Sequence, residues 1–149
     1  MRHLFSPRSM SRMLKPIVLL LAAGVCRAAD YTWDASGGAP ADDGTGNWNA
    51  AGGTNWFDGS TYGAWGNTTA DRALFGVGNG AAGTITVGTV DANGILFNAP
   101  GSGNYTLNSG TITLGGTTPT ITANVNATIG SGIAGSAGLV KEGTGTLSF

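Results

Sequence analysis

The chain has 149 residues, of which 27 are glycine, and charged side chains make up only 10% of it. Seven basic and eight acidic residues give a net charge of −1. This length allows one modest domain. A chain with so few basic residues is a poor candidate for nucleic-acid binding, because neutralising phosphates requires a basic patch.

Residues 1–28 have the organisation of a secretory signal peptide. Four basic residues precede an apolar run over 16–25, which has the length of a signal-peptide core and is short for a bilayer span. Small residues flank Arg27, which predicts cleavage near Ala28. A short membrane anchor is the alternative interpretation. Export would place the mature chain outside the cytoplasm, either secreted or at the cell surface.

Removing this segment changes the chemistry that remains. Cys26 and His3 both leave with it, so the mature chain can form no disulfide, no Cys–His zinc site and no Ser–His–Asp triad. Only Arg72 and Lys141 remain against eight acidic residues, which gives a net charge of 2 − 8 = −6. We therefore expect no catalytic residue, no cofactor and no nucleic-acid partner.

Short β-branched runs separated by glycine, asparagine and serine dominate the chain from about residue 81. Threonine alternates with apolar residues in several runs, which predicts half-buried strands. No segment has the i, i+3, i+4, i+7 apolar spacing of a helix, so the predicted fold class is all-β. The clusters between the runs favour turns. The predicted strands are 84–87, 95–97, 105–107, 111–114, 120–122 and 146–149.

Two architectures fit such short strands. The segment 83–88 recurs at 110–115, which is 27 residues later, and 145–149 resembles it again after 35 more. A parallel β-helix stacks like strands from successive coils. An antiparallel β-sandwich usually has longer, more regularly alternating strands joined by defined hairpins. Runs of three to five residues favour the parallel β-helix, with the antiparallel β-sandwich as the alternative.

The segment 29–80 differs from the rest because it holds all four tryptophans. An open first coil would expose strand edges and apolar side chains, so we expect Trp48, Trp56 and Trp65 to form a capping segment. Exposed indoles can also stack on sugar rings, which makes the same three residues candidates for carbohydrate binding. The predicted organisation is a signal peptide over 1–28, a Trp-rich cap over 29–80 and β-helix coils over 81–149.

The end of the chain resembles the autotransporter-associated β-strand repeat, also called the passenger-associated transport repeat. Its Gly-Leu-x-Lys-x-Gly-x-Gly-x-Leu pattern is matched by Gly138, Leu139, Lys141, Gly143, Gly145 and Leu147. The stretches at 33–34, 47–48, 55–56 and 71–75 are similar to the leaders of such proteins. The resemblance implies a secreted or surface-displayed right-handed β-helix, and the chain ends inside its first clear repeat.

Acidic residues are the remaining candidates for chemistry. Paired carboxylates can catalyse glycoside hydrolysis. The adjacent Asp42 and Asp43, however, lie in a glycine-rich segment that favours Asx-type turns, so they should point apart into solvent. With Asp34 they could supply oxygen ligands to calcium, but no known calcium-loop spacing is present. We therefore predict no catalytic pair and no metal site.

The sequence favours a non-enzymatic structural or adhesive module of the β-helix passenger type. Its expected partners are cell-surface polysaccharides or other surface proteins, and membranes would be involved only through export. One alternative is a carbohydrate-binding module that uses the Trp-rich segment, and another is the N-terminal part of a polysaccharide-active enzyme. Arg72 is expected at the start of a strand, paired or solvated, and Lys141 over a turn beside Glu142.

Overall fold

The computed structural model describes residues 28–39 and 42–149. The predicted signal peptide therefore lies outside the described residues, apart from Ala28. The described part of the chain forms fifteen strands and no helix. It accordingly contains no helix long and apolar enough to cross a membrane.

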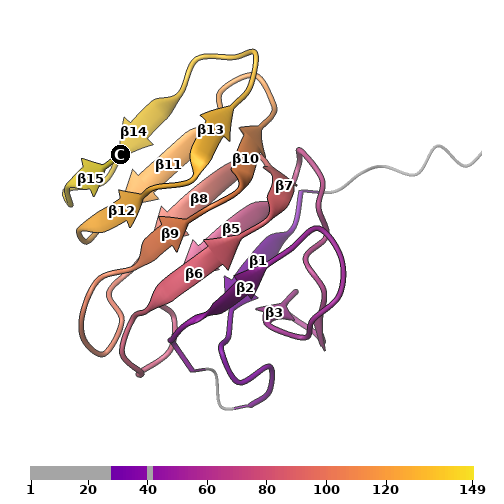
Figure 1. Cartoon of the computed structure of the whole chain (residues 1–149), viewed down its shortest axis with the longest axis vertical. Helices are drawn as coiled ribbons and strands as arrows, with labels where there is room; N and C mark the ends of the chain where they lie inside the picture. Colours follow the sequence, from indigo (N-terminus) through magenta and orange to yellow (C-terminus); the bar gives the residue numbers. More distant parts are fainter. Residues whose placement is uncertain (1–27, 40–41) are drawn as a thin grey trace, which may run out of the picture.

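The strands are arranged in three sheets (Figure 1). The seven-stranded sheet contains β1 (Asp30–Trp33), β3 (Trp56–Phe57), β4 (Tyr62–Gly63), β5 (Arg72–Phe75), β8 (Gly94–Phe97), β11 (Thr120–Ala123) and β14 (Val140–Glu142). The five-stranded sheet contains β2 (Gly46–Trp48), β6 (Thr84–Val87), β9 (Thr106–Asn108), β12 (Ala127–Ile129) and β15 (Leu147–Ser148). The three-stranded sheet contains β7 (Thr89–Ala92), β10 (Thr111–Leu114) and β13 (Gly132–Ala134).

Successive coils of the chain contribute one strand to each sheet. The complete coils are β5–β6–β7, β8–β9–β10 and β11–β12–β13, and each strand pairs in parallel with its counterpart in the next coil. The strands β1 and β2 stack below, and β14 and β15 stack above (Figure 1). The fold is a β-solenoid of about four turns, which confirms the parallel β-helix and not the β-sandwich.

The coil length differs from the period that the sequence similarity suggested. Leu107 pairs with Ile85 in the preceding coil and with Ile129 in the following coil, and 22 residues separate it from each of them. The same number of residues separates Asn93 from Gly115, its hydrogen-bond partner on the next coil. The similar segments 83–88 and 110–115 do not stack on each other, because β6 and β10 belong to different sheets. Their likeness has another origin. Every half-buried strand needs alternating threonine and apolar residues, whichever sheet it joins.

Apolar side chains of the same register form columns inside the solenoid. In β6 the alternation predicted from the sequence is observed, with Ile85 and Val87 buried and both threonines exposed. In the seven-stranded sheet Phe75 pairs with Phe97, and Phe97 pairs with Ala123. The rings of Phe75 and Phe97 are stacked, with centroids 5.5 Å apart. The core therefore narrows from aromatic to small side chains towards the C-terminal end.

A short antiparallel hairpin covers the first strand of the solenoid. The strand β3 pairs antiparallel with β1 and with β4, so that β3 and β4 complete the N-terminal edge of the seven-stranded sheet. An uncovered edge strand would present unpaired backbone groups to other chains. Within the segment 29–80, β1 and β2 belong to the parallel stack, while β3 and β4 close it.

Candidate functional site

The tryptophans pack together inside the N-terminal end of the solenoid. Trp48, Trp56 and Trp65 are 0%, 2% and 3% exposed. The ring centroids of Trp56 and Trp65 lie 4.8 Å apart, and those of Trp48 and Trp65 lie 5.1 Å apart. Stacking on a sugar requires an exposed aromatic face. Here the three indoles pack against one another edge-on or tilted and are buried, which leaves no exposed face.

Phe75 lies at the centre of this aromatic core. Its ring contacts five others, with centroid distances of 5.2–6.1 Å. These rings belong to Trp33, Trp48, Trp56, Phe97 and Tyr105. Sequence reasoning missed this central position, because all five partners are distant along the chain and meet Phe75 only through the coiling.

Asp43 is buried, which corrects the expectation that Asp42 and Asp43 both point into solvent. Asp42 is exposed as expected. The Tyr105 hydroxyl donates to Asp43 Oδ1 at 2.7 Å and accepts a hydrogen bond from the Gly44 N–H at 3.2 Å. Burial and the bond to Asp43 raise the pKa of Tyr105 above its ordinary value. The phenol is therefore a neutral donor that gives the Asp43 carboxylate a partner inside the protein.

The Asp34 carboxylate is fully buried, and one of its oxygens is surrounded by hydrogen-bond donors. Oδ1 accepts from the Ser36 N–H at 2.9 Å, the Ser36 hydroxyl at 2.7 Å, the Gly37 N–H at 3.2 Å and the Asp42 N–H at 3.2 Å. Burial alone would raise the pKa of Asp34, but the hydrogen bonds to this carboxylate outweigh it and lower that pKa. The donors therefore stabilise the charged form of Asp34.

The structure does not assemble the calcium cage considered from the sequence. Among residues 28–39 and 42–149, no group of three or more His, Cys, Asp or Glu side chains is placed to hold a metal ion. Four N–H and O–H donors already bond to Asp34 Oδ1. Asp34 instead fixes the turn that follows β1.

We expect Asp34→Asn to destabilise the protein at pH 7 by about 1–3 kcal/mol, because a neutral amide oxygen is a weaker acceptor than a carboxylate for the four donors around it. Because folding lowers the pKa of Asp34, the carboxylate stabilises the folded state at pH values above 3.8, the ordinary pKa of the group. This stabilisation is lost as the pH falls through the pKa that Asp34 has in the folded state. The stability difference between wild type and variant, measured by urea unfolding, should therefore narrow between pH 7 and pH 3. The exposed Asp42→Asn is the control. A difference that did not change with pH would contradict this role.

Arg72 begins β5, as predicted, and forms an ion pair across two coils. Its Nε donates to Asp30 Oδ1 at 2.9 Å and its Nη2 donates to Asp30 Oδ2 at 2.6 Å. The two residues are directly paired in the register of β1 and β5. Because both side chains are about half exposed, the pair contributes little to stability and supplies no chemistry.

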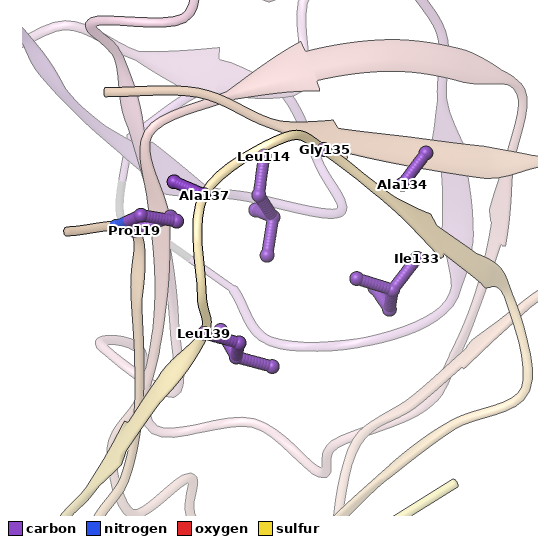
Figure 2. A pocket seen from close by; sticks show the side chains of 7 residues that line it. All are labelled: Leu114, Pro119, Ile133, Ala134, Gly135, Ala137 and Leu139. Atoms are coloured by element: carbon purple, nitrogen blue, oxygen red, sulfur yellow. The ribbon is translucent and has the colours of Figure 1, made fainter. Parts of the chain in front are cut away.

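A pocket of about 230 Å³ lies at the opposite end of the solenoid. Figure 2 shows the side chains of Leu114, Ile133 and Leu139 pointing into the same space. The remaining lining residues are Pro119, Ala134, Gly135 and Ala137. The pocket lies where the connection from β13 to β14 passes over that from β10 to β11. The side chains that line it are apolar and none is titratable, while backbone groups supply the polar part of its surface.

The repeat-motif residues extend from the connection before β14, through β14 and the turn over 143–145, to β15. Lys141 Nζ donates to the carbonyl oxygens of Gly143 at 2.8 Å and Gly145 at 2.6 Å. A Cβ atom on Gly143 or Gly145 would overlap a backbone carbonyl of the preceding coil, and Gly143 also has a φ of +78°. Gly138 has open space around it. Two of the three motif glycines are thus required sterically. Leu139 lines the pocket, and Leu147 is half-buried against the core.

These features define the class of protein as a β-solenoid with an aromatic, hairpin-covered N-terminal end and an apolar C-terminal end. The chain is 39% identical over 142 residues to the adhesin BmaC autotransporter of Brucella suis biovar 1 (strain 1330). The match covers 89% of this chain and 4% of the relative, so the chain spans a small part of that protein's length. No protein-family model matches the chain, and no solved structure gives a significant match. The similarity and the solenoid fold agree with the resemblance to autotransporter-associated repeats.

Proposed function

We propose that the chain is a non-enzymatic adhesive module of the passenger type, displayed outside the cytoplasm after cleavage near Ala28. The observation that carries this proposal is the 39% identity to an autotransporter adhesin, on a chain that folds as a β-solenoid. A surface solenoid presents long, regular outer faces to a partner. The partners proposed are cell-surface polysaccharides or other surface proteins.

The outer face of the five-stranded sheet is the best candidate for the contact surface. Thr84, Thr106, Thr128 and Ser148 occupy the same register position in four successive strands. Neighbouring strands lie about 4.8 Å apart, so the hydroxyls form a regular row. Charged side chains are absent from the described strands of this sheet. Such a face suits a neutral, hydroxyl-rich polymer better than a charged one.

A binding or catalytic site made from this chain's own tryptophans or aspartates has less support than the adhesive module. A carbohydrate-binding module that uses Trp48, Trp56 and Trp65 would need indoles that leave the core. A hydrolase that uses Asp42 and Asp43 would need convergent carboxylates. Here one of the two is exposed, and the other accepts a hydrogen bond from Tyr105.

Adhesion can be tested with beads that carry the mature chain. We expect these beads to attach to cultured mammalian cells more than albumin-coated beads do, and to attach less after the cells' surface polysaccharides are digested. Thr106→Asp with Thr128→Asp should reduce attachment by tenfold or more, because two charges would interrupt the hydroxyl row. The matched control is Thr89→Asp with Thr111→Asp, a pair in register on the three-stranded sheet. Attachment no greater than that of albumin beads would contradict the adhesive role.

A further inference from the structure

The chain contains two Asn-Gly pairs, and the structure places them in different environments. The pairs are Asn79-Gly80 and Asn93-Gly94. In such a pair the backbone nitrogen of the glycine can attack the side-chain carbonyl carbon of the asparagine, because glycine has no Cβ atom to hinder the approach. The attack requires an accessible side-chain amide and a backbone that can rotate. The two pairs can therefore differ in reactivity although their sequences are the same.

Asn79 meets both requirements. It is exposed and lies in the connection from β5 to β6, and neither Asn79 nor Gly80 belongs to a strand. Among residues 28–39 and 42–149, no hydrogen bond involves the Asn79 side chain, and no group accepts from the Gly80 N–H. The amide that would be attacked and the nitrogen that would attack it are therefore both available.

Asn93 meets neither requirement. Its side chain is half-buried, and its Nδ2 donates to the Gly115 carbonyl oxygen on the next coil at 3.1 Å. Gly94 is buried and begins β8, where it pairs in register with Arg72 on one side and Thr120 on the other. Rotating the Gly94 nitrogen towards the Asn93 side chain would disrupt this pairing, so the reaction would have to wait for local opening of the coils.

We infer that Asn79 is a site of spontaneous covalent modification, and that the fold protects Asn93 from the same reaction. The Gly80 nitrogen forms a bond to Asn79 Cγ, and the C–N bond of the side-chain amide breaks. Ammonia leaves with the proton of the Gly80 N–H, and a cyclic imide remains. Water then opens the imide at either carbonyl, which gives an aspartyl or an isoaspartyl residue at position 79 and adds one negative charge. Water is the only co-reactant, and the inference is independent of the adhesive role.

The isoaspartyl product changes a contact between adjacent coils. The connections β5–β6 and β8–β9 lie side by side, with Ala81 bridged to Ser102 (Figure 1). The Gly80 carbonyl accepts from the Gly101 N–H at 2.8 Å, and a Cβ atom on Gly101 would overlap the Asn79 carbonyl oxygen. An isoaspartyl linkage runs the main chain through Cβ and Cγ of residue 79 and converts its former carbonyl into a carboxylate. The aspartyl product leaves the backbone at this contact unchanged.

The test follows both pairs by mass spectrometry while the mature chain is incubated in mildly alkaline buffer, either folded or unfolded in guanidinium chloride. A protease that cleaves before aspartate cuts before Asp71 and Asp91, which puts Asn79 and Asn93 on different peptides. Peptide 71–90 contains no asparagine or glutamine besides Asn79. This protease does not cut before isoaspartate, so a converted peptide that remains uncut at position 79 contains the isoaspartyl linkage.

In the folded chain we expect Asn79 to convert about tenfold or more faster than Asn93, because Asn93 reacts only through locally opened states. In guanidinium chloride the two rates should be similar. Asn79→Gln is the control, since its longer side chain forms the imide far more slowly. This variant should lack the more acidic species that accumulates in wild type on anion exchange. An unchanged peptide 71–90 from the folded chain would overturn the modification site. Equal rates in the folded chain, or continued protection of Asn93 in guanidinium chloride, would overturn the protection by the fold.

Discussion

Replacing Phe75 by alanine should lower the free energy of unfolding by about 3–5 kcal/mol, the range for removing a large buried aromatic side chain. Phe75 is fully buried and its ring touches rings from β1, β2, β3 and β8 and from Tyr105. The cavity would therefore lie where the hairpin-covered end joins the regular coils. Urea unfolding followed by tryptophan fluorescence measures the loss directly, because all four indoles lie in this end.

Phe149→Ala is the matched control, since it removes the same side chain from a position that is 72% exposed. We expect this control to change stability by less than about 0.5 kcal/mol. A loss below about 1 kcal/mol for Phe75→Ala, far under the usual range for such a change, would mean that the N-terminal aromatic core is not packed as described.

Gly110→Ala should destabilise the protein by about 2–4 kcal/mol, through backbone strain and steric overlap together. Gly110 has a φ of +50°, and a Cβ there would overlap the carbonyl oxygens of Val87 and Gly88 in the coil below. The same turn carries hydrogen bonds from the Thr111 N–H to the Gly88 carbonyl and from the Gly132 N–H to the Gly110 carbonyl. Any shift that relieves the overlap would disturb the pairing of three coils.

Gly52→Ala separates the two causes. Gly52 has a φ of +79°, but a Cβ added to it would have no atom within 4 Å. It should therefore show the cost of positive φ alone, about 1 kcal/mol. Thermal unfolding of both variants gives the comparison. Equal losses for the two would show that the coils are not in close contact at Gly110.

The strands could be predicted from the sequence because their signals are local. The alternation in 84–87 and 111–114 matches β6 and β10 residue for residue. The register could not be predicted in the same way. Any half-buried strand carries the same threonine–apolar alternation, so a likeness between segments does not show which strands stack. Turn lengths decide the register, and these vary, since the step from Leu107 to Ile129 is longer than the step from Thr120 to Val140.

The interior contacts of the N-terminal end were also hidden in the sequence. Asp43 resembles a turn residue, and its burial depends on Tyr105, which lies 62 residues further along the chain. The strand β13 carries only one large apolar side chain, Ile133, and its short Gly-Ile-Ala run has no strand signal. Lys141 likewise resembles a turn residue. Only the pairing with Ile121 reveals that it occupies a core column.

The most direct test of the solenoid is a proximity measurement across its coils. Once Cys26 is changed to serine, the chain has no cysteine, so pairs of cysteines labelled with pyrene can be introduced freely. Thr106 and Thr128 are directly paired on adjacent coils, whereas Thr86 and Thr113, which occupy equivalent places in the two similar segments, lie in different sheets. The parallel solenoid predicts excimer emission from the Thr106/Thr128 pair and none from the Thr86/Thr113 pair. Excimer emission from Thr86/Thr113 without any from Thr106/Thr128 would contradict it.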